Sequence, residues 1–159
     1  MESKSLLLFL AATVCMACQT DSGARLSDSE RTAVRDTIDA ITERLATSIS
    51  NRDAIAAADH VPGDSSIVYI SDGFVIRGHD YVTVLSNYYG GLQSLVFRWD
   101  RKEFYVLDPS TVVMVGWASL SAVDTVGVTQ DDEAIFTVVY HREDSAWWMV
   151  TAHKTTLAR

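Results

Sequence analysis

The order of hydrophobic and polar residues predicts helices in the first part of the chain and strands in most of the rest. Apolar side chains first recur at the spacing of one helix face, at Val34, Ile38, Ile41, Leu45 and Ile49. Residues 27–30, Ser-Asp-Ser-Glu, have the pattern of a capping box, so we expect a helix of about 22 residues to begin there. Residues 51–53, Asn-Arg-Asp, interrupt this pattern and cap a second, short helix over residues 54–59.

Strand-like patterns follow. Two short strands, residues 67–70 and 74–77, are predicted on either side of the turn Ser71-Asp72-Gly73. A third helix over residues 81–89 starts after Gly78 and is closed by Gly90 and Gly91. Four long strands come next, at residues 93–107, 111–123, 134–141 and 147–155, with a polar turn at 127–132. This order predicts an α+β fold in which three N-terminal helices cover a curved antiparallel sheet.

The last strand has apolar residues on both of its faces. Strict alternation would place Trp147, Met149, Thr151, His153 and Thr155 on one face and Trp148, Val150, Ala152 and Lys154 on the other. We therefore expect helices to cover one face of the sheet and a second subunit of a homodimer to cover the other.

The composition and the net charge limit the kinds of molecule that the protein is expected to bind. With 159 residues and 48% apolar residues, the chain is long and hydrophobic enough for one domain with a real core. Its net charge of −8 argues against nucleic acids and anionic lipid surfaces, because both are bound through clusters of Lys and Arg.

The N-terminus has the pattern of a targeting segment. Lys4 and the amino terminus precede an apolar run that is too short to span a bilayer, so residues 1–17 are predicted to be a signal peptide. Residues 15–18, Cys-Met-Ala-Cys, resemble a bacterial lipobox, which implies lipidation of Cys18. Gln19 in place of Asp then implies an exported lipoprotein anchored in the outer membrane and facing the periplasm. The alternative is cleavage after Ala17 without lipidation, giving a secreted or periplasmic protein. Residues 18–26 are a polar tether, and the domain itself spans residues 27–159.

No cofactor or metal site is predicted. Both cysteines precede the domain, so it can form no disulfide and no thiolate site. The four histidines, at positions 60, 79, 141 and 153, are scattered over different elements, and no glycine-rich loop begins a helix.

Three parts of the sequence together resemble the nuclear-transport-factor-2-like (NTF2-like) superfamily and its SnoaL-like branch. They are the Asn51-x-Asp53 junction, the hairpin Asp72-Gly73-x-x-x-Arg77-Gly78, and the ending Trp147-x-Met-x-Thr-x-His-x-Thr155, which is similar to the kinase association domain pattern. The resemblance implies a sheet wrapped into a cone, closed by the helices around an apolar pocket, with an outer face that often forms dimers. It leaves activity open, since the superfamily contains isomerases, dehydratases, hydrolases and non-catalytic proteins.

Several residues are candidates for such a pocket. The aromatic candidates for its walls are Tyr69, Tyr88, Trp99, Trp117, Tyr140 and Trp148. Lys154 stands where the kinase association domain has a pocket Arg, which implies a contact to a carboxylate ligand. His153 titrates near neutrality and is the candidate acid or base, although a lone His on an apolar strand is more often structural.

The sequence thus leaves three hypotheses for function. The first is a non-catalytic binder of a small apolar or weakly acidic molecule. The second is a SnoaL-like lyase, isomerase or hydrolase that uses His153, which would require a carboxylate such as Asp59 beside His153 or Lys154 in a cavity. The third is a structural dimerisation module in the cell envelope. The absence of an evident acid–base pair favours the binder.

Overall fold

The computed structural model describes residues 26–64 and 67–158. The predicted signal peptide, Cys18 and the tether up to residue 25 lie outside the described residues. Within the described part, the helices are α1 (Asp28–Ser50), α2 (Ala54–Ala57) and α3 (Gly78–Gly90). The strands are β1 (Val68–Ser71), β2 (Phe74–Arg77), β3 (Leu92–Asp108), β4 (Thr111–Asp124), β5 (Thr129–Glu143) and β6 (Ala146–Thr156).

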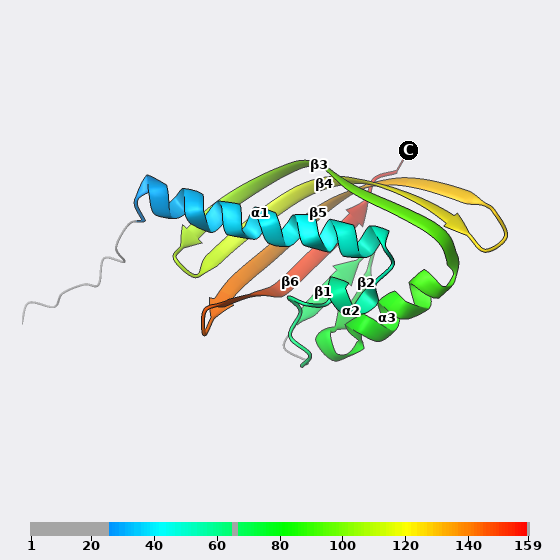
Figure 1. Ribbon diagram of the computed structural model, residues 1–159, viewed down its shortest axis with the longest axis horizontal. Helices are drawn as coiled ribbons and strands as arrows, with labels where there is room; N and C mark the ends of the chain where they lie inside the picture. The colour runs from blue at the N-terminus through cyan, green and yellow to red at the C-terminus, as the bar shows by residue number, and fades with distance from the viewer. Residues whose placement is uncertain (1–25, 65–66, 159) are drawn as a thin grey trace, which may run out of the picture.

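The six strands of the described chain form one curved, open sheet in the order β2-β1-β6-β5-β4-β3. Figure 1 shows α1 running along one face of this sheet, with α2 and α3 gathered near β1 and β2. The predicted fold class, an α+β domain with a curved sheet and N-terminal helices, is confirmed. The prediction of a fully antiparallel sheet is wrong at one pairing, because β1 runs parallel to β6. No short turn joins these two strands, so local sequence does not fix their relative direction.

The first helix begins as its capping box predicts. The backbone N–H of Ser27 donates to Glu30 Oε2 (2.8 Å), and the backbone N–H of Glu30 donates to Ser27 Oγ (3.3 Å). On β3, the Trp99 indole N–H donates to the backbone carbonyl of Thr42 (3.0 Å), and the Lys102 ammonium contacts Asp39 Oδ1 at 2.5 Å. Polar contacts therefore fix α1 to β3 in addition to its apolar face.

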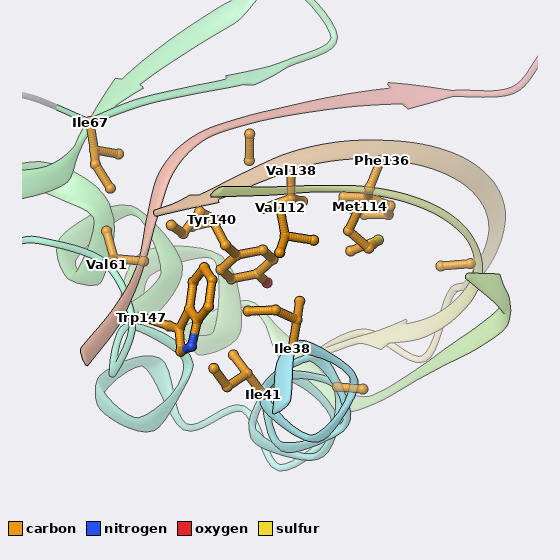
Figure 2. Close-up of a cluster of buried hydrophobic side chains, with 14 of the residues drawn as sticks. Ile38, Ile41, Val61, Ile67, Val112, Met114, Phe136, Val138, Tyr140 and Trp147 are labelled. Atoms are coloured by element: carbon orange, nitrogen blue, oxygen red, sulfur yellow. The ribbon is translucent and has the colours of Figure 1, made fainter. Parts of the chain in front are cut away.

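The predicted helix face supplies the centre of the core. Ile38 and Ile41 are buried and point toward Tyr140 and Trp147 on the sheet (Figure 2). Burying a side chain of this size stabilises the fold by about 1.5–3 kcal/mol. The core thus forms between α1 and the middle strands, away from the outer face of the sheet.

A β-bulge in β6 changes which side chains face the helices. Val139 pairs with Thr151 and Tyr140 pairs with Met149, so Val150 has no partner of its own on β5. The extra residue reverses the alternation beyond it. Ala152 is therefore buried together with Met149, whereas His153 is exposed. The strict alternation predicted for this strand is wrong after Val150.

Turn residues also define where strands end. Gly73 has φ +89° and Asp72 φ +48°, as the predicted hairpin turn requires. Between β5 and β6, Asp144 and Ser145 both have positive φ, which narrows the predicted break to a two-residue turn. The turn predicted at residues 127–132 is too long, because β5 already starts at Thr129, where its backbone pairs with Val123 of β4.

Candidate ligand-binding cavity

A cavity of about 430 Å³ lies on the helix-facing side of the sheet, between α1, α3 and the strands. Apolar and aromatic side chains form most of its wall, including Leu45, Ile49, Tyr81, Leu85, Phe97, Leu120, Phe136 and Val138. Polar side chains gather where β1, β5 and β6 contribute to the lining: Ser71, Asp72, Gln130, Asp132, Lys154 and Thr156. Such an apolar volume with a few convergent polar groups is typical of small-molecule sites.

The aromatic part of the wall is fixed by edge-to-face contacts. The ring centroids of Phe97 and Trp99 lie 4.8 Å apart at 85°, and those of Trp99 and Phe136 lie 5.3 Å apart at 79°. Gly116 on β4 makes room for this arrangement, since a Cβ there would lie 2.5 Å from Cζ3 of Trp99. The observed position of the indole ring therefore requires glycine at position 116 on the neighbouring strand.

At the polar end, Asp72 is held by residues of β6. Its carboxylate accepts hydrogen bonds from the backbone N–H of Thr156 (2.7 Å) and from the Thr156 hydroxyl (2.9 Å), and Lys154 Nζ lies at 3.3 Å. The Thr156 backbone hydrogen bond first, and then the Thr156 hydroxyl and the Lys154 charge, lower the pKa of Asp72 to about 2. Asp72 is thus a weak base, and its charge is matched by Lys154.

Tyrosines border the same polar end. Burial raises the pKa of Tyr69 to about 12, partly offset by a hydrogen bond with the Ser71 side chain. Burial, and then the negative charge of Asp132, raise the pKa of Tyr88 above its ordinary value. The hydroxyl of Tyr89 is buried and has no hydrogen-bond partner within the described residues. A buried polar group without a partner costs about 1–3 kcal/mol, so this hydroxyl is an unsatisfied group in the cavity wall.

A second cavity of about 410 Å³ lies between α1, α2 and the sheet. Leu45 and Met149 line both cavities and separate them. At its rim, the imidazole Nδ1 of His60 lies 2.9 Å from the backbone carbonyl oxygen of Trp147, and Nε2 lies 3.4 Å from Arg44 Nη2. The polar side chains at this rim therefore contact each other and the backbone of β6.

The residues that the sequence suggests for a pocket lie in three different places in the structure. Tyr69, Tyr88, Trp99 and Lys154 line the first cavity. Tyr140 and Asp59 line the second, and Tyr140 is buried in the core. Trp117 and Trp148 are half-buried residues outside both cavities, and the guanidinium of Arg101 lies 4.6 Å from the Trp117 ring centroid.

His153 is exposed on the outer face of the sheet and is not among the residues that line either cavity. Its neighbour Lys154 faces inward, and the carboxylate beside Lys154 is Asp72, not Asp59. The bulge at Val150 causes this exchange of faces.

The sequence did not point to several residues that line the cavity, namely Asp72, Gln130, Asp132, Tyr89 and Thr156. The sequence predicts the Asp72-Gly73 turn but gives no sign that the Asp72 side chain lines a cavity. It predicts a turn over Gln130 and Asp132, and their inward direction follows only from the start of β5 at Thr129.

Two negative findings apply to residues 26–64 and 67–158. No group of three or more His, Cys, Asp or Glu side chains there is placed to hold a metal ion. None of the three helices combines the length and the hydropathy that crossing a bilayer requires.

No family model and no curated protein matches the sequence. Solved structures do match the fold. A hexachlorocyclohexane dehydrochlorinase, LinA-type3 from Novosphingobium barchaimii, has a TM-score of 0.72 and 15% identity, covering 83% of this chain and 92% of its own. An NTF2-like superfamily protein from Salmonella enterica has a TM-score of 0.70 and 18% identity, with coverages of 81% and 94%. A protein of unknown function from Mycobacterium tuberculosis has a TM-score of 0.73 and 13% identity, with coverages of 86% and 79%.

These similarities show that the chain has the NTF2-like fold, as the resemblance in its sequence implied. At such low identity they show the fold alone.

Proposed function

We propose that this domain binds a small, largely apolar molecule without transforming it. The observation that carries the proposal is the cavity of about 430 Å³, whose wall is mostly apolar and aromatic and whose few polar side chains gather at one end. Apolar burial supplies affinity in such a site, and the few polar groups orient the ligand.

The titratable groups support binding over acid–base catalysis. General acid–base catalysis works best with groups whose pKa lies near the working pH. Asp72, with a pKa of about 2, is too weak a base, and Tyr69, with a pKa of about 12, is too weak an acid. His153 is exposed on the outer face, so the hypothesis of an acid or base at this position lacks support from the cavity. The dehydrochlorinase of similar fold shows that the fold accommodates an enzyme, but it does not transfer an activity.

Binding can be tested with a matched pair of variants on one helix. Val84 lines the cavity, whereas Val82 does not, and their exposed fractions are 38% and 37%. Neutral two-ring aromatic alcohols should raise the melting temperature of the wild-type protein and of Val82→Trp, because a ligand that binds the folded state stabilises it. Val84→Trp should abolish this shift by filling the cavity. No shift with any such compound, or an equal shift in both variants, would contradict the proposal and leave a structural dimerisation module as the better account.

We also propose that the protein is a homodimer that pairs through the outer face of the sheet. Half-buried apolar side chains occupy outward positions of β4 and β5: Val113, Val115, Trp117, Ile135 and Val139. A second copy of the chain would cover the same surface on both subunits, as two-fold symmetric dimers do.

The N-terminal segment supports a further proposal about location. A signal peptide over residues 1–17 and lipidation at Cys18 would produce an exported lipoprotein, held at the outer membrane by its lipid and facing the periplasm. In that arrangement the domain meets the membrane only through its anchor, and its cavity is open to small molecules of the cell envelope.

A further inference from the structure

The polar end of the cavity has more negative than positive side chains. Among the described residues that line it, the charged ones are Asp72, Asp132 and Lys154. Lys154 lies 3.3 Å from Asp72, so these two charges compensate each other. The carboxylate of Asp132 accepts a hydrogen bond from the neutral Gln130 amide (2.8 Å), and no cationic side chain of the described residues forms an ion pair with it. The cavity therefore has one uncompensated negative charge.

Asp132 is oriented toward the tyrosines at this end. It lies on β5 at the same parity as the buried Ala134 and Phe136, which places its side chain on the helix-facing side. After burial, the negative charge of Asp132 is the second cause of the raised pKa of Tyr88. Asp132 also borders a shallow depression that Arg98 lines, but the Arg98 guanidinium forms its ion pair with Asp100 (2.9 Å).

The wall next to Asp132 suits a cation as well. Seven aromatic residues line the cavity: Tyr69, Tyr81, Tyr88, Tyr89, Phe97, Trp99 and Phe136. The faces of aromatic rings attract cations, by about 0.5–2 kcal/mol for each well-placed ring. The same rings remain good partners for an apolar ligand body.

Tyr89 adds an unsatisfied polar group to the wall of the cavity. Tyr89 is 6% exposed, and its oxygen has no hydrogen-bond partner within the described residues. The oxygen of a phenol can accept a hydrogen bond from an N–H donor. An ammonium group beside Asp132 would compensate the charge of this carboxylate, which has no ion-pair partner among the described residues.

An anionic ligand meets the opposite situation. The chain has a net charge of −8, and Lys154, the one cation in the described lining, would have to leave Asp72 to contact a carboxylate. Breaking this ion pair inside a partly buried site costs free energy. A new ion pair between Lys154 and a ligand carboxylate would only offset that cost and would give no net gain. A weakly acidic ligand, which the position of Lys154 suggested from the sequence, is therefore disfavoured.

We propose that the cavity prefers a protonated amine with an aromatic body, and that the ammonium group lies at the polar end beside Asp132 and the tyrosines. This inference rests on the proposed binding function and narrows its ligand to a charge class.

Three probes with one common ring system test the charge preference. They are 1-naphthylmethylamine, which is cationic at pH 7, 1-naphthalenemethanol, which is neutral, and 1-naphthoate, which is anionic. Calorimetric titration of the full chain should give the tightest dissociation constant for the amine, about tenfold below that of the alcohol, and the weakest binding for the carboxylate. Raising the ionic strength should reduce the ratio between amine and alcohol, because salt screens the charge of Asp132.

A pair of neighbouring variants identifies the responsible carboxylate. Asp132→Asn keeps the shape of the side chain and removes its charge, so the ratio between the affinities for the amine and the alcohol should fall by about tenfold. Asp131→Asn is the matched control, because Asp131 is exposed and does not line the cavity, and it should leave both affinities unchanged.

The outcomes separate this inference from the function on which it rests. Equal affinities for amine and alcohol, or tightest binding of the carboxylate, would overturn the charge preference and leave the binding function intact. Binding of none of the three probes would overturn both. If Asp132→Asn does not fold, the salt dependence of the amine-to-alcohol ratio in the wild-type protein decides the question without a variant.

Discussion

The carboxylate of Asp72 accepts hydrogen bonds from both the backbone N–H and the hydroxyl of Thr156, at 2.7 and 2.9 Å. Asp72 lies in the turn between β1 and β2, and Thr156 is the last residue of β6. One side chain therefore fastens the small hairpin to the final strand, and it does so at the polar end of the cavity.

Removing this carboxylate should destabilise the protein. Asp72→Ala leaves the Thr156 N–H and the Lys154 ammonium without their acceptor, so we expect the free energy of unfolding to fall by about 1–3 kcal/mol at pH 7. Urea denaturation measures this difference. Asp131→Ala, which removes an exposed carboxylate of β5, should change the stability by less than about 0.5 kcal/mol. Equal effects of the two substitutions would contradict the role of Asp72.

The stabilisation by Asp72 should depend on pH in one direction. Its pKa in the folded protein, about 2, is lower than the ordinary value of 3.8, so folding favours the ionised form. The contribution is complete above about pH 5 and is lost as the pH falls toward 2. Because 38% of the side chain is exposed, solvent screening limits this part to about 1 kcal/mol. The stability difference between wild type and Asp72→Ala should therefore shrink on acidification, and a constant difference from pH 7 to 2.5 would refute this account.

Gly116 should tolerate no side chain without a response from Trp99. In Gly116→Ala the new Cβ would lie 2.5 Å from Cζ3 of Trp99, so the indole must move, at a cost of about 1–3 kcal/mol. Thermal denaturation measures the loss, and a change in Trp fluorescence should accompany it. Gly90→Ala is the matched control, since no atom outside the local chain lies within 4 Å of its Cβ. A Gly116→Ala protein as stable as Gly90→Ala would show that the ring is not confined.

A charge on the outer face should separate the proposed dimer. Val115 lies on the outward side of β4, opposite Thr137 of β5, and is half-buried. Val115→Glu should give the mass of a monomer in light scattering at micromolar concentration, because a buried unpaired carboxylate opposes association. Wild type and Val126→Glu, a change in the exposed turn after β4, should both give a dimer. A monomeric wild-type protein would rule out the dimer.

Cys18→Ser should release the protein from membranes. Lipidation requires the thiol of Cys18, so its removal should leave the protein in the soluble fraction after cell fractionation. Mass spectrometry of the mature N-terminus should find a lipid on Cys18 in the wild type. An unmodified N-terminus, or unchanged membrane retention of Cys18→Ser, would exclude the anchor.

The parts of the fold that local interactions determine were predictable from the sequence. The capping box at Ser27 and the turn at Asp72 and Gly73 act over a few residues, and each occurs as expected. The apolar face of α1 was equally predictable, since Ile38 and Ile41 have to be buried somewhere.

The predictions that were wrong concern features formed by residues far apart in the sequence. The bulge at Val150 is a property of the pairing between β5 and β6, and the residue types of β6 alone do not encode it. The bulge places His153 on the outer face of the sheet and Lys154 on the inner face. Of these two candidates, only Lys154 therefore lines the cavity. The contact between Asp72 and Lys154 joins residues 82 positions apart, which no local pattern could indicate.

The parallel pairing of β1 with β6 has a consequence for the time course of folding. Residues 68–71 pair with residues 151–154, so this part of the sheet cannot form until β6 is available. Until then β1 and β2 are a two-stranded hairpin, which is marginally stable in isolation and has an unpaired edge. Contacts of such long sequence separation slow folding and prolong the exposure of this edge. A chain that stops before Thr151 would leave β1 without its partner strand, and its unpaired edge would favour aggregation and proteolysis.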